Sequence, residues 1–200
     1  MIVVGLTGGI ASGKTTITNF LKKNRYMVHD SDSVIKKIYL KPTKKFLQHL
    51  KKIKLSTAIN KGQINKDVIR NKIFENKNQK TKLEKFLHSE VKKERGEFIK
   101  KQKKKNTKIV ILDIPLLFEA KLTHICDYVV LLTAPKKTRI QRAIKRKGMK
   151  KNIVLKIMKN QLGDNYKRKK SDFVINTTKT KSQSFKMILR IINNIIKRHA

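Results

Sequence analysis

The sequence has few of the residues that mark secreted, membrane-spanning or zinc-binding proteins. One cysteine in 200 residues, Cys126, excludes an internal disulfide and suits a cytoplasmic protein. No apolar run approaches the roughly 18 residues that suggest a membrane-spanning helix. The first residues already read as a strand, so we expect no signal peptide. Neither C-x-x-C nor H-E-x-x-H occurs, which argues against a zinc site. We therefore expect a cytoplasmic protein without a membrane partner.

Acidic residues are also scarce. There are 13 Asp and Glu against 51 Lys and Arg, a net charge of +38. Such a charge attracts anions, nucleic acid included. The lysines, however, recur in nearly every segment rather than in one stripe, aromatic residues make up only 6%, and no signature of an RNA-recognition module occurs. We expect a solvated basic surface, with some steering of anionic ligands and no specific nucleic-acid partner.

The most informative segment is residues 8–15, Gly-Gly-Ile-Ala-Ser-Gly-Lys-Thr, which follows an apolar run at 2–6. This is the G-x-x-x-x-G-K-[ST] phosphate-binding motif between a strand and a helix, the context it requires. Successive backbone N–H groups bind phosphate at the positive end of the helix dipole. We expect Gly8 and Gly13 to adopt positive φ, Lys14 to reach the β- and γ-phosphates, and the Thr15 hydroxyl to ligate Mg²⁺.

Short β-branched runs alternate with helical patterns along the chain. Strands are expected at residues 2–6, 26–29, 108–114, 127–132 and 172–175. Four of these runs are almost continuously apolar, which is typical of strands buried on both faces of a parallel sheet. The alternation predicts an α/β fold, a doubly wound, mostly parallel five-stranded sheet.

The chain length suggests one domain with subregions. We expect a core formed by residues 1–38, 108–135 and 171–200. About eighty residues separate the second strand from the third, far more than one crossover helix needs, so residues 39–107 are expected to form a helical insertion. Residues 100–108 are expected to be its exit loop. The basic stretch 136–170, interrupted at Gly148, is expected to form a helical hairpin that serves as a lid.

Two carboxylates, Asp30 and Asp32, follow the second strand at the edge where α/β sheets bind ligands. A kinase that phosphorylates an alcohol needs a carboxylate to orient the hydroxyl and accept its proton. Either aspartate is a candidate for this base. The alternative is that one of them only caps the helix that opens at Ser33.

Asp113 ends the third strand and is a candidate Walker-B-type carboxylate that holds Mg²⁺ through water, the alternative being a loop cap. Pro115 ends this strand, and Leu116 to Phe118 are expected to form an apolar wall.

Three arginines, Arg139, Arg142 and Arg146, are spaced i, i+3 and i+7, which predicts one helix face. They are candidates for covering the transferring phosphoryl group. The alternative is a charged face turned toward solvent.

Together these segments resemble the dephospho-coenzyme A kinase family. Residues 4–15 match the family's opening (V/I)-G-L-T-G-G-I-x-S-G-K-[ST], 30–32 match its D-x-D, and 115–119 match its P-L-L-[FY]-E. Arg142 and Arg146 followed by Gln161 match its lid pattern. Residues 174–176 match the end of its last strand.

Three positions depart from the family pattern. Lys66 stands where the family usually has Arg, which keeps the charge but loses the bidentate geometry. Ser89 replaces the Pro after the His, and Asn176 replaces a common Asp. These departures concern the substrate lobe and a strand end, and leave the phosphate loop unchanged.

The resemblance implies transfer of the γ-phosphate of ATP, with Mg²⁺, to the ribose 3′-hydroxyl of dephospho-CoA, giving CoA and ADP in the last step of coenzyme A biosynthesis. The insertion would then bind the substrate. By position, the resemblance implies Asp32 as the base and Arg142 as a lid residue that closes over the site. On the motif chemistry above, we expect Lys14 also to be catalytic and Asp113 with Thr15 to lie at the metal. The ATP-binding residues would be Gly8, Ala11, Ser12, Gly13, Lys14, Thr15, Thr16 and Arg146. The dephospho-CoA side would comprise Asp30, His88, Pro115, Leu116, Leu117, Phe118 and Glu119.

Two other readings stay open on the residues alone. One is a different small-molecule P-loop kinase acting on a nucleoside or nucleotide. The other is a basic nucleic-acid-binding protein that carries a nucleotide site. A monomer or small homo-oligomer is expected in each case.

Overall fold

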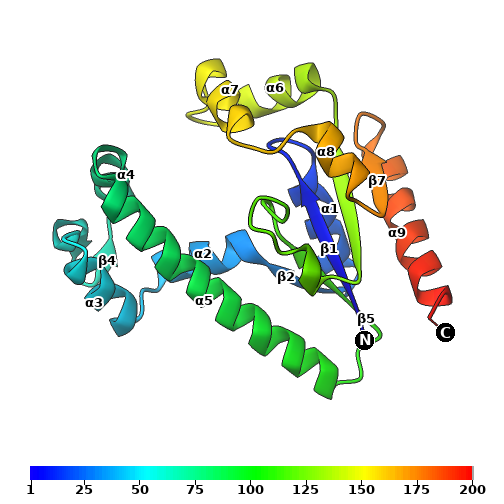
Figure 1. The fold of residues 1–200 in the computed structure, drawn as a ribbon, viewed down its shortest axis with the longest axis horizontal. Helices are drawn as coiled ribbons and strands as arrows, with labels where there is room; N and C mark the ends of the chain where they lie inside the picture. The colour runs from blue at the N-terminus through cyan, green and yellow to red at the C-terminus, as the bar shows by residue number, and fades with distance from the viewer. Residues whose placement is uncertain (200) are drawn as a thin grey trace. The chain divides into compact units, whose positions relative to one another are not determined.

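The computed structural model describes residues 1–199 and forms two compact units (Figure 1). We call residues 1–30 together with 101–199 the sheet unit, and residues 31–100 the helical unit. The helical unit begins at Ser31, earlier than the boundary near residue 39 suggested by the sequence. The reason is that the chain leaves strand β2 (Met27–Asp30) and enters helix α2 (Ser31–Leu40) without a loop.

The sheet unit contains five parallel strands in the order β2-β5-β1-β6-β7. Besides β2, they are β1 (Ile2–Gly8), β5 (Ile109–Asp113), β6 (Tyr128–Thr133) and β7 (Phe173–Asn176). The five predicted strands and the predicted α/β fold are confirmed. All carboxyl ends point to one edge of the sheet, where ligands of open α/β sheets bind.

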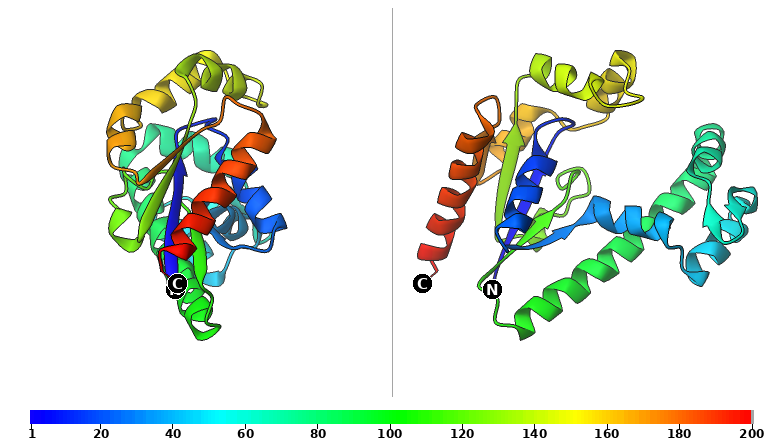
Figure 2. Two further views of the ribbon diagram at one scale, coloured as in Figure 1. Left: turned by 90° about the vertical axis from the view of Figure 1, so that its right-hand side faces the viewer. Right: turned by 180° about the vertical axis from the view of Figure 1, so that it is seen from behind.

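Helices α1 (Lys14–Lys23) and α9 (Lys181–Lys197) pack together against one face of the sheet (Figure 2). Their apolar stripes, with Ile17 and Leu21 on α1 and Ile188 on α9, are buried against alternate residues of β1, β5 and β6. The rings of Phe20 and Phe185 stack with their centroids 4.0 Å apart. This packing fixes the amino end of α1 at the end of β1.

The basic stretch after β6 forms three short helices rather than the expected hairpin. These are α6 (Lys136–Ile144), α7 (Lys151–Lys159) and α8 (Asp164–Lys169). Helices α6 and α7 lie beyond the carboxyl ends of β1 and β6, whereas α8 packs beside β6 on the way to β7 (Figure 1). Gly148, with φ +77°, turns the chain between α6 and α7. Because α6 ends at Ile144, Arg146 lies in the turn that follows, and the expectation of three arginines on one helix face is wrong.

The helical unit has its own apolar core around Phe46, Leu50, Leu55 and Leu83. Its elements are α2, α3 (Lys44–Lys52), the 3₁₀ turn η1 (Ser56–Ala58), the hairpin β3 (Ile59–Asn60) and β4 (Gln63–Ile64), α4 (Lys66–Glu75) and α5 (Lys77–Lys104) up to residue 100, after which the sheet unit resumes. A second 3₁₀ turn, η2 (Thr123–Ile125), belongs to the sheet unit.

Helix α5 continues to Lys104, so the loop expected from residue 100 is wrong over its first half. The residues there are lysine and glutamine, which favour helix, so a polar run by itself does not end α5. Within residues 1–199, no helix has the length and apolarity needed to cross a membrane.

Candidate active site

The loop between β1 and α1 has the conformation of a phosphate cradle. Gly13 is left-handed, at φ +89°, which confirms the expectation for this glycine. The second left-handed residue is Ala11, at φ +57°, and not Gly8. Gly8 is instead the last residue of β1, where a Cβ would lie 2.4 Å from Ser12 Oγ and 2.5 Å from the Leu132 carbonyl oxygen. Glycine at position 8 therefore allows neighbouring atoms to approach the backbone closely, and it is not needed for a positive φ.

The amino end of α1 is open to an anion. Gly13 provides no side-chain cap, and no acidic residue lies in the first turn. The first N–H groups of a helix lack intrahelical partners and carry the positive end of its dipole. The hydroxyl-bearing residues Thr15 and Thr16 are exposed in this first turn. The arrangement can bind phosphate oxygens through main-chain N–H groups.

Lys14 is held beside the loop by Asp113. Its Nζ lies 2.6 Å from Asp113 Oδ1, and Thr18 Oγ1 donates to the other carboxylate oxygen. Asp113 is 2% exposed, and burial raises the pKa of its carboxyl group above the ordinary value. The nearby Lys14 charge and the hydrogen bonds from Lys14 and Thr18 oppose this rise, and the Asp30 charge adds to it. The sheet thus keeps a partly desolvated ammonium ready at the phosphate loop.

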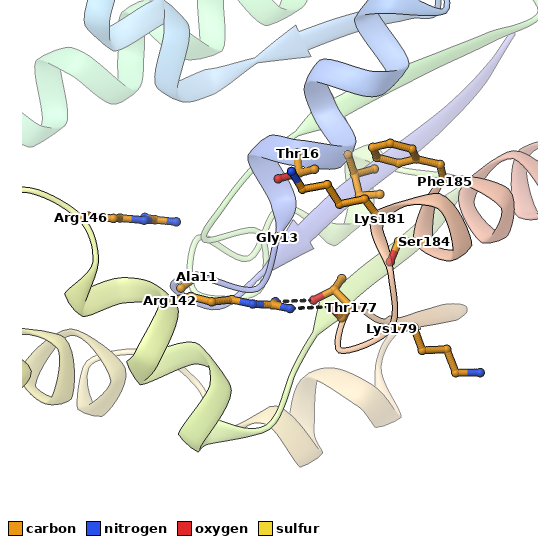
Figure 3. Close-up of a pocket in the computed structure, with 11 residues that line it drawn as sticks. Ala11, Gly13, Thr16, Arg142, Arg146, Thr177, Lys179, Lys181, Ser184 and Phe185 are labelled. Atoms are coloured by element: carbon orange, nitrogen blue, oxygen red, sulfur yellow. Dashed lines mark hydrogen bonds between the residues drawn. The ribbon is translucent and has the colours of Figure 1, made fainter.

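A pocket of about 220 Å³ opens beside the loop (Figure 3). Its lining combines loop residues with cations, namely Ala11, Gly13, Thr16, Ile17, Arg142, Arg146, Thr177, Lys179, Lys181, Ser184 and Phe185. Arg142 crosses from α6 and donates from Nη1 to Thr177 Oγ1 at 2.9 Å and from Nη2 to the Thr177 carbonyl at 2.6 Å. Positive charge and glycine backbone together suit an anionic ligand.

Arg139 does not face this pocket. It is 7% exposed, pairs with Asp164 at the start of α8, and its guanidinium lies against Gly9, where a Cβ would be 2.3 Å from Nη1. Nearby, the Gln161 side-chain oxygen accepts from Ile10 N at 3.1 Å. These contacts connect the segment of short helices to the phosphate loop, so the role of Arg139 is structural. Of the three arginines, Arg142 and Arg146 line the pocket.

The segment Pro115–Glu119 is a turn anchored at both ends. Thr7 Oγ1 donates to the Pro115 carbonyl at 3.1 Å, and the fully buried Leu117 packs beside Gly5. Phe118 is 7% exposed, with its ring edge-to-face with that of Tyr166. Of the expected apolar wall, only Leu116 presents its side chain broadly to solvent, at 46% exposure.

Glu119 at the end of this turn contacts α8 and the residues just before it. Its Oε1 lies 2.7 Å from Lys167 Nζ and accepts from Leu162 N at 3.0 Å. Lys167 is completely buried. In this structure the Glu119 carboxylate therefore joins the turn to α8.

The candidate bases lie at and just after the end of β2. Asp30 is in register with Asp113 on the neighbouring strand, and its Oδ2 lies 2.8 Å from Lys22 Nζ. Asp32 follows two residues later, exposed in the first turn of α2. His88 is exposed on α5. Asp32 and His88 belong to the helical unit, and their catalytic and binding roles remain predictions.

The sequence-based reading missed Thr18, Lys167 and Thr177. Thr18 was detectable, because it lies one turn after Lys14 on the helix face that also buries Ile17. Thr177 follows β7 at the ligand-binding edge, a position that the strand-end rule used for Asp30 and Asp113 would have selected. Lys167 gave no signal, since a lysine in a lysine-rich stretch is normally exposed.

Comparison with known proteins agrees with this geometry. A family model described as dephospho-CoA kinase matches residues 2–183. The dephospho-CoA kinase of Fusobacterium nucleatum is 32% identical over 201 residues, covering 98% of this chain and 99% of the relative. That of Bartonella quintana is 32% identical over 199 residues, covering 98% and 100%.

Solved structures give the same result for the fold. A crystal structure from Thermus thermophilus superposes with a TM-score of 0.79 at 25% identity and covers 96% of both chains. Dephospho-CoA kinase from Campylobacter jejuni superposes with a TM-score of 0.73 at 22% identity, covering 99% of this chain and 98% of that one. With a family model over most of its length and relatives that match from end to end, this chain belongs to the dephospho-CoA kinase family.

Proposed function

We propose that this protein transfers the γ-phosphate of ATP to the ribose 3′-hydroxyl of dephospho-CoA, giving CoA and ADP. The observation that carries the proposal is the open, uncapped amino end of α1 with Lys14 beside it, in a chain matched by the dephospho-CoA kinase model over residues 2–183. We further propose that it acts in the cytoplasm, as a monomer or small homo-oligomer, without a nucleic-acid or membrane partner.

The nucleotide phosphates would lie in the loop formed by residues 8–16. Main-chain N–H groups at the start of α1 would bind their oxygens, and Lys14 would exchange Asp113 for the β- and γ-phosphates. Arg142 and Arg146 line the adjoining pocket and would neutralise charge on the transferring group.

The side chains at the phosphate loop are compatible with a bound magnesium ion. Among residues 1–199 no cluster of three His, Cys, Asp or Glu exists that could hold a metal alone. Mg²⁺ does not need one, because it keeps several waters and takes one or two protein oxygens plus substrate phosphates. Thr15 would hold the ion through its exposed hydroxyl, and Asp113, whose oxygens contact Lys14 and Thr18, would do so through water. When bound, the ion neutralises charge on the phosphates.

Asp32 is the proposed base, with Asp30 as the second candidate. The 3′-oxygen of the acceptor would form a bond to the γ-phosphorus while the bond from that phosphorus to the β–γ bridging oxygen breaks. The hydroxyl proton would pass to the aspartate, and ADP would leave. Secondary alcohols are weak nucleophiles, which is why a positioned carboxylate is needed.

The dephospho-CoA side is proposed to include His88 and the turn Pro115–Glu119. Within this turn, Leu116 and the half-buried Pro115 have surface available to a ligand. Leu117 and Phe118 are buried and would support the turn from beneath, and Glu119 would fix it to α8.

A substrate panel tests the proposal. With ATP and Mg²⁺, release of ADP should be stimulated by dephospho-CoA and not by uridine, shikimate or thymidylate. Stimulation by a nucleoside or nucleotide alone would replace the proposal with a different P-loop kinase activity.

Paired variants test the base. Asp32→Asn should lower kcat by roughly 10²–10⁴-fold, as loss of general-base catalysis does, while ATP binding stays near wild type. Asp30→Asn tests the second candidate in the same assays and should lower kcat less. If Asp30→Asn is the more damaging of the two, the base is Asp30.

A further inference from the structure

Two neighbouring threonines at the end of β7 have opposite environments. Thr177 is 7% exposed, whereas Thr178 is exposed and its hydroxyl donates to Asn176 Oδ1 at 2.7 Å. Only Thr177 lines the pocket beside the phosphate loop (Figure 3). Of two neighbouring threonines, one is therefore part of the candidate site and the other lies outside it.

Thr177 joins two parts of this site. Its hydroxyl donates to the Ser12 carbonyl at 2.9 Å, inside the phosphate loop. The same oxygen accepts from Arg142 Nη1 at 2.9 Å, and the Thr177 carbonyl accepts from Arg142 Nη2 at 2.6 Å. Thr177 N donates to the Thr133 carbonyl at 2.8 Å, which fixes this residue to the end of β6.

The geometry limits how these contacts can be arranged. A threonine hydroxyl has one proton, and giving it to Ser12 leaves only acceptor lone pairs for Arg142. The guanidinium is planar and presents a rigid fork of donors, so two bonds to one residue fix its plane. Thr177 also packs against Gly13, where an added Cβ would lie 3.3 Å from Thr177 Oγ1.

We propose that Thr177 is a positioning residue that couples the phosphate loop to Arg142 and thereby sets the affinity for the nucleotide. The inference rests on the proposed function in treating the bound nucleotide as ATP. Thr177 acts through Arg142 and Ser12, and needs no contact with the phosphates.

The test compares three variants. Thr177→Val keeps the shape and removes the hydroxyl, Thr177→Ser keeps the hydroxyl, and Thr178→Val is the matched control. Binding of ATP is measured by calorimetric titration, which needs no acceptor. Thr177→Val should weaken binding about tenfold, the scale of a lost buried hydrogen-bond partner. Thr177→Ser and Thr178→Val should stay within about threefold of wild type.

Steady-state kinetics add a readout that a purely structural role would not change. Thr177→Val should raise KM for ATP and leave KM for dephospho-CoA within about twofold. Because Thr177 acts partly through Arg142, adding Thr177→Val to Arg142→Ala should weaken ATP binding by clearly less than Thr177→Val does in the wild-type protein, the remainder coming from the Ser12 contact.

Three results would overturn the proposal. They are ATP affinity of Thr177→Val equal to wild type, equal weakening in Thr177→Ser, or fully additive losses in the double variant. If Thr177→Val fails to fold, Thr177→Ala replaces it in the same titrations, with the melting temperature as a check. Failure of the proposed function is distinguishable, because wild type would then bind ATP without dephospho-CoA-stimulated turnover.

Discussion

One ion pair of the sheet unit and one of the helical unit have the same chemistry and opposite environments. In the sheet unit, the side chains of Lys167 and Glu119 are 1% and 16% exposed, and their residues are far apart in the sequence. In the helical unit, Lys80 and Glu84 are each 53% exposed and lie one helical turn apart. The first pair depends on the tertiary fold, whereas the second needs only a helix.

The difference determines what each pair contributes. A buried charge has lost its hydration and depends on its partner, so removing that partner is costly. An exposed pair is screened by water and salt, and typically contributes less than about 1 kcal/mol. In a chain with 51 basic residues most lysines are exposed, and the few in buried pairs hold the site together.

Lys167→Met should have the largest effect on stability. It leaves the Glu119 carboxylate, which is largely buried, without its ammonium partner, so the free energy of unfolding should fall by about 3 kcal/mol or more. Urea unfolding at pH 7 measures this. The double variant Lys167→Met with Glu119→Gln should recover part of the loss. A single variant as stable as wild type would show that the buried pair is worth no more than an exposed one.

Lys14→Met should have a smaller, pH-dependent effect. Burial already raises the pKa of Asp113 above its ordinary value of 3.8, so its ionisation costs stability as pH rises through that titration. Removing Lys14 raises this pKa further. The free energy of unfolding that Lys14→Met loses relative to wild type should thus be near zero below about pH 4. It should grow as pH rises, to about 1–3 kcal/mol at pH 7. A loss that is constant from pH 4 to pH 7 would contradict this account.

Added salt should raise the melting temperature of the protein by a few degrees. A net charge of +38 causes self-repulsion, which added salt screens, so the melting temperature should rise between about 50 and 300 mM NaCl. The destabilisation by Lys167→Met should be nearly the same at both concentrations, because a buried pair is screened much less. A falling melting temperature would mean that attractive surface pairs outweigh the repulsion.

Lys80→Met should have the smallest effect and is the matched control for Lys167→Met. The exposed pair with Glu84 spans 3.9 Å on the surface of α5, so its loss should change the free energy of unfolding by no more than about 0.5 kcal/mol. Urea unfolding under the same conditions measures it. A loss of the size expected for Lys167→Met would remove the distinction between the two units.

Most of the fold could be predicted, because each strand is an apolar run between helical patterns. The phosphate loop was equally clear, since the motif fixes which residues sit between β1 and α1. The lid could not be predicted in detail. A basic stretch shows where helices are favoured, but the turns around Gly148 and Gly163 and the pairing of Arg139 with Asp164 depend on contacts between segments.

The site was predicted where a motif names the residue and missed where a contact decides its role. Lys14 was found from the motif, and Thr18, which bonds to the other oxygen of the same Asp113 carboxylate, was not. Arg139, Arg142 and Arg146 looked equivalent by spacing, yet one is buried against Gly9, one bonds to Thr177, and one lies past the helix end.

By itself, the sequence determined the phosphate loop, the five strands and the family, because local patterns and motif spacing carry that information. Only the tertiary structure decided which few cations are buried and what they face. Lys14 meets Asp113, Lys167 meets Glu119 and Arg142 meets Thr177. The physical reason is that the environment of a side chain depends on which distant segments fold against it, and no local pattern in a lysine-rich chain distinguishes a buried lysine from an exposed one.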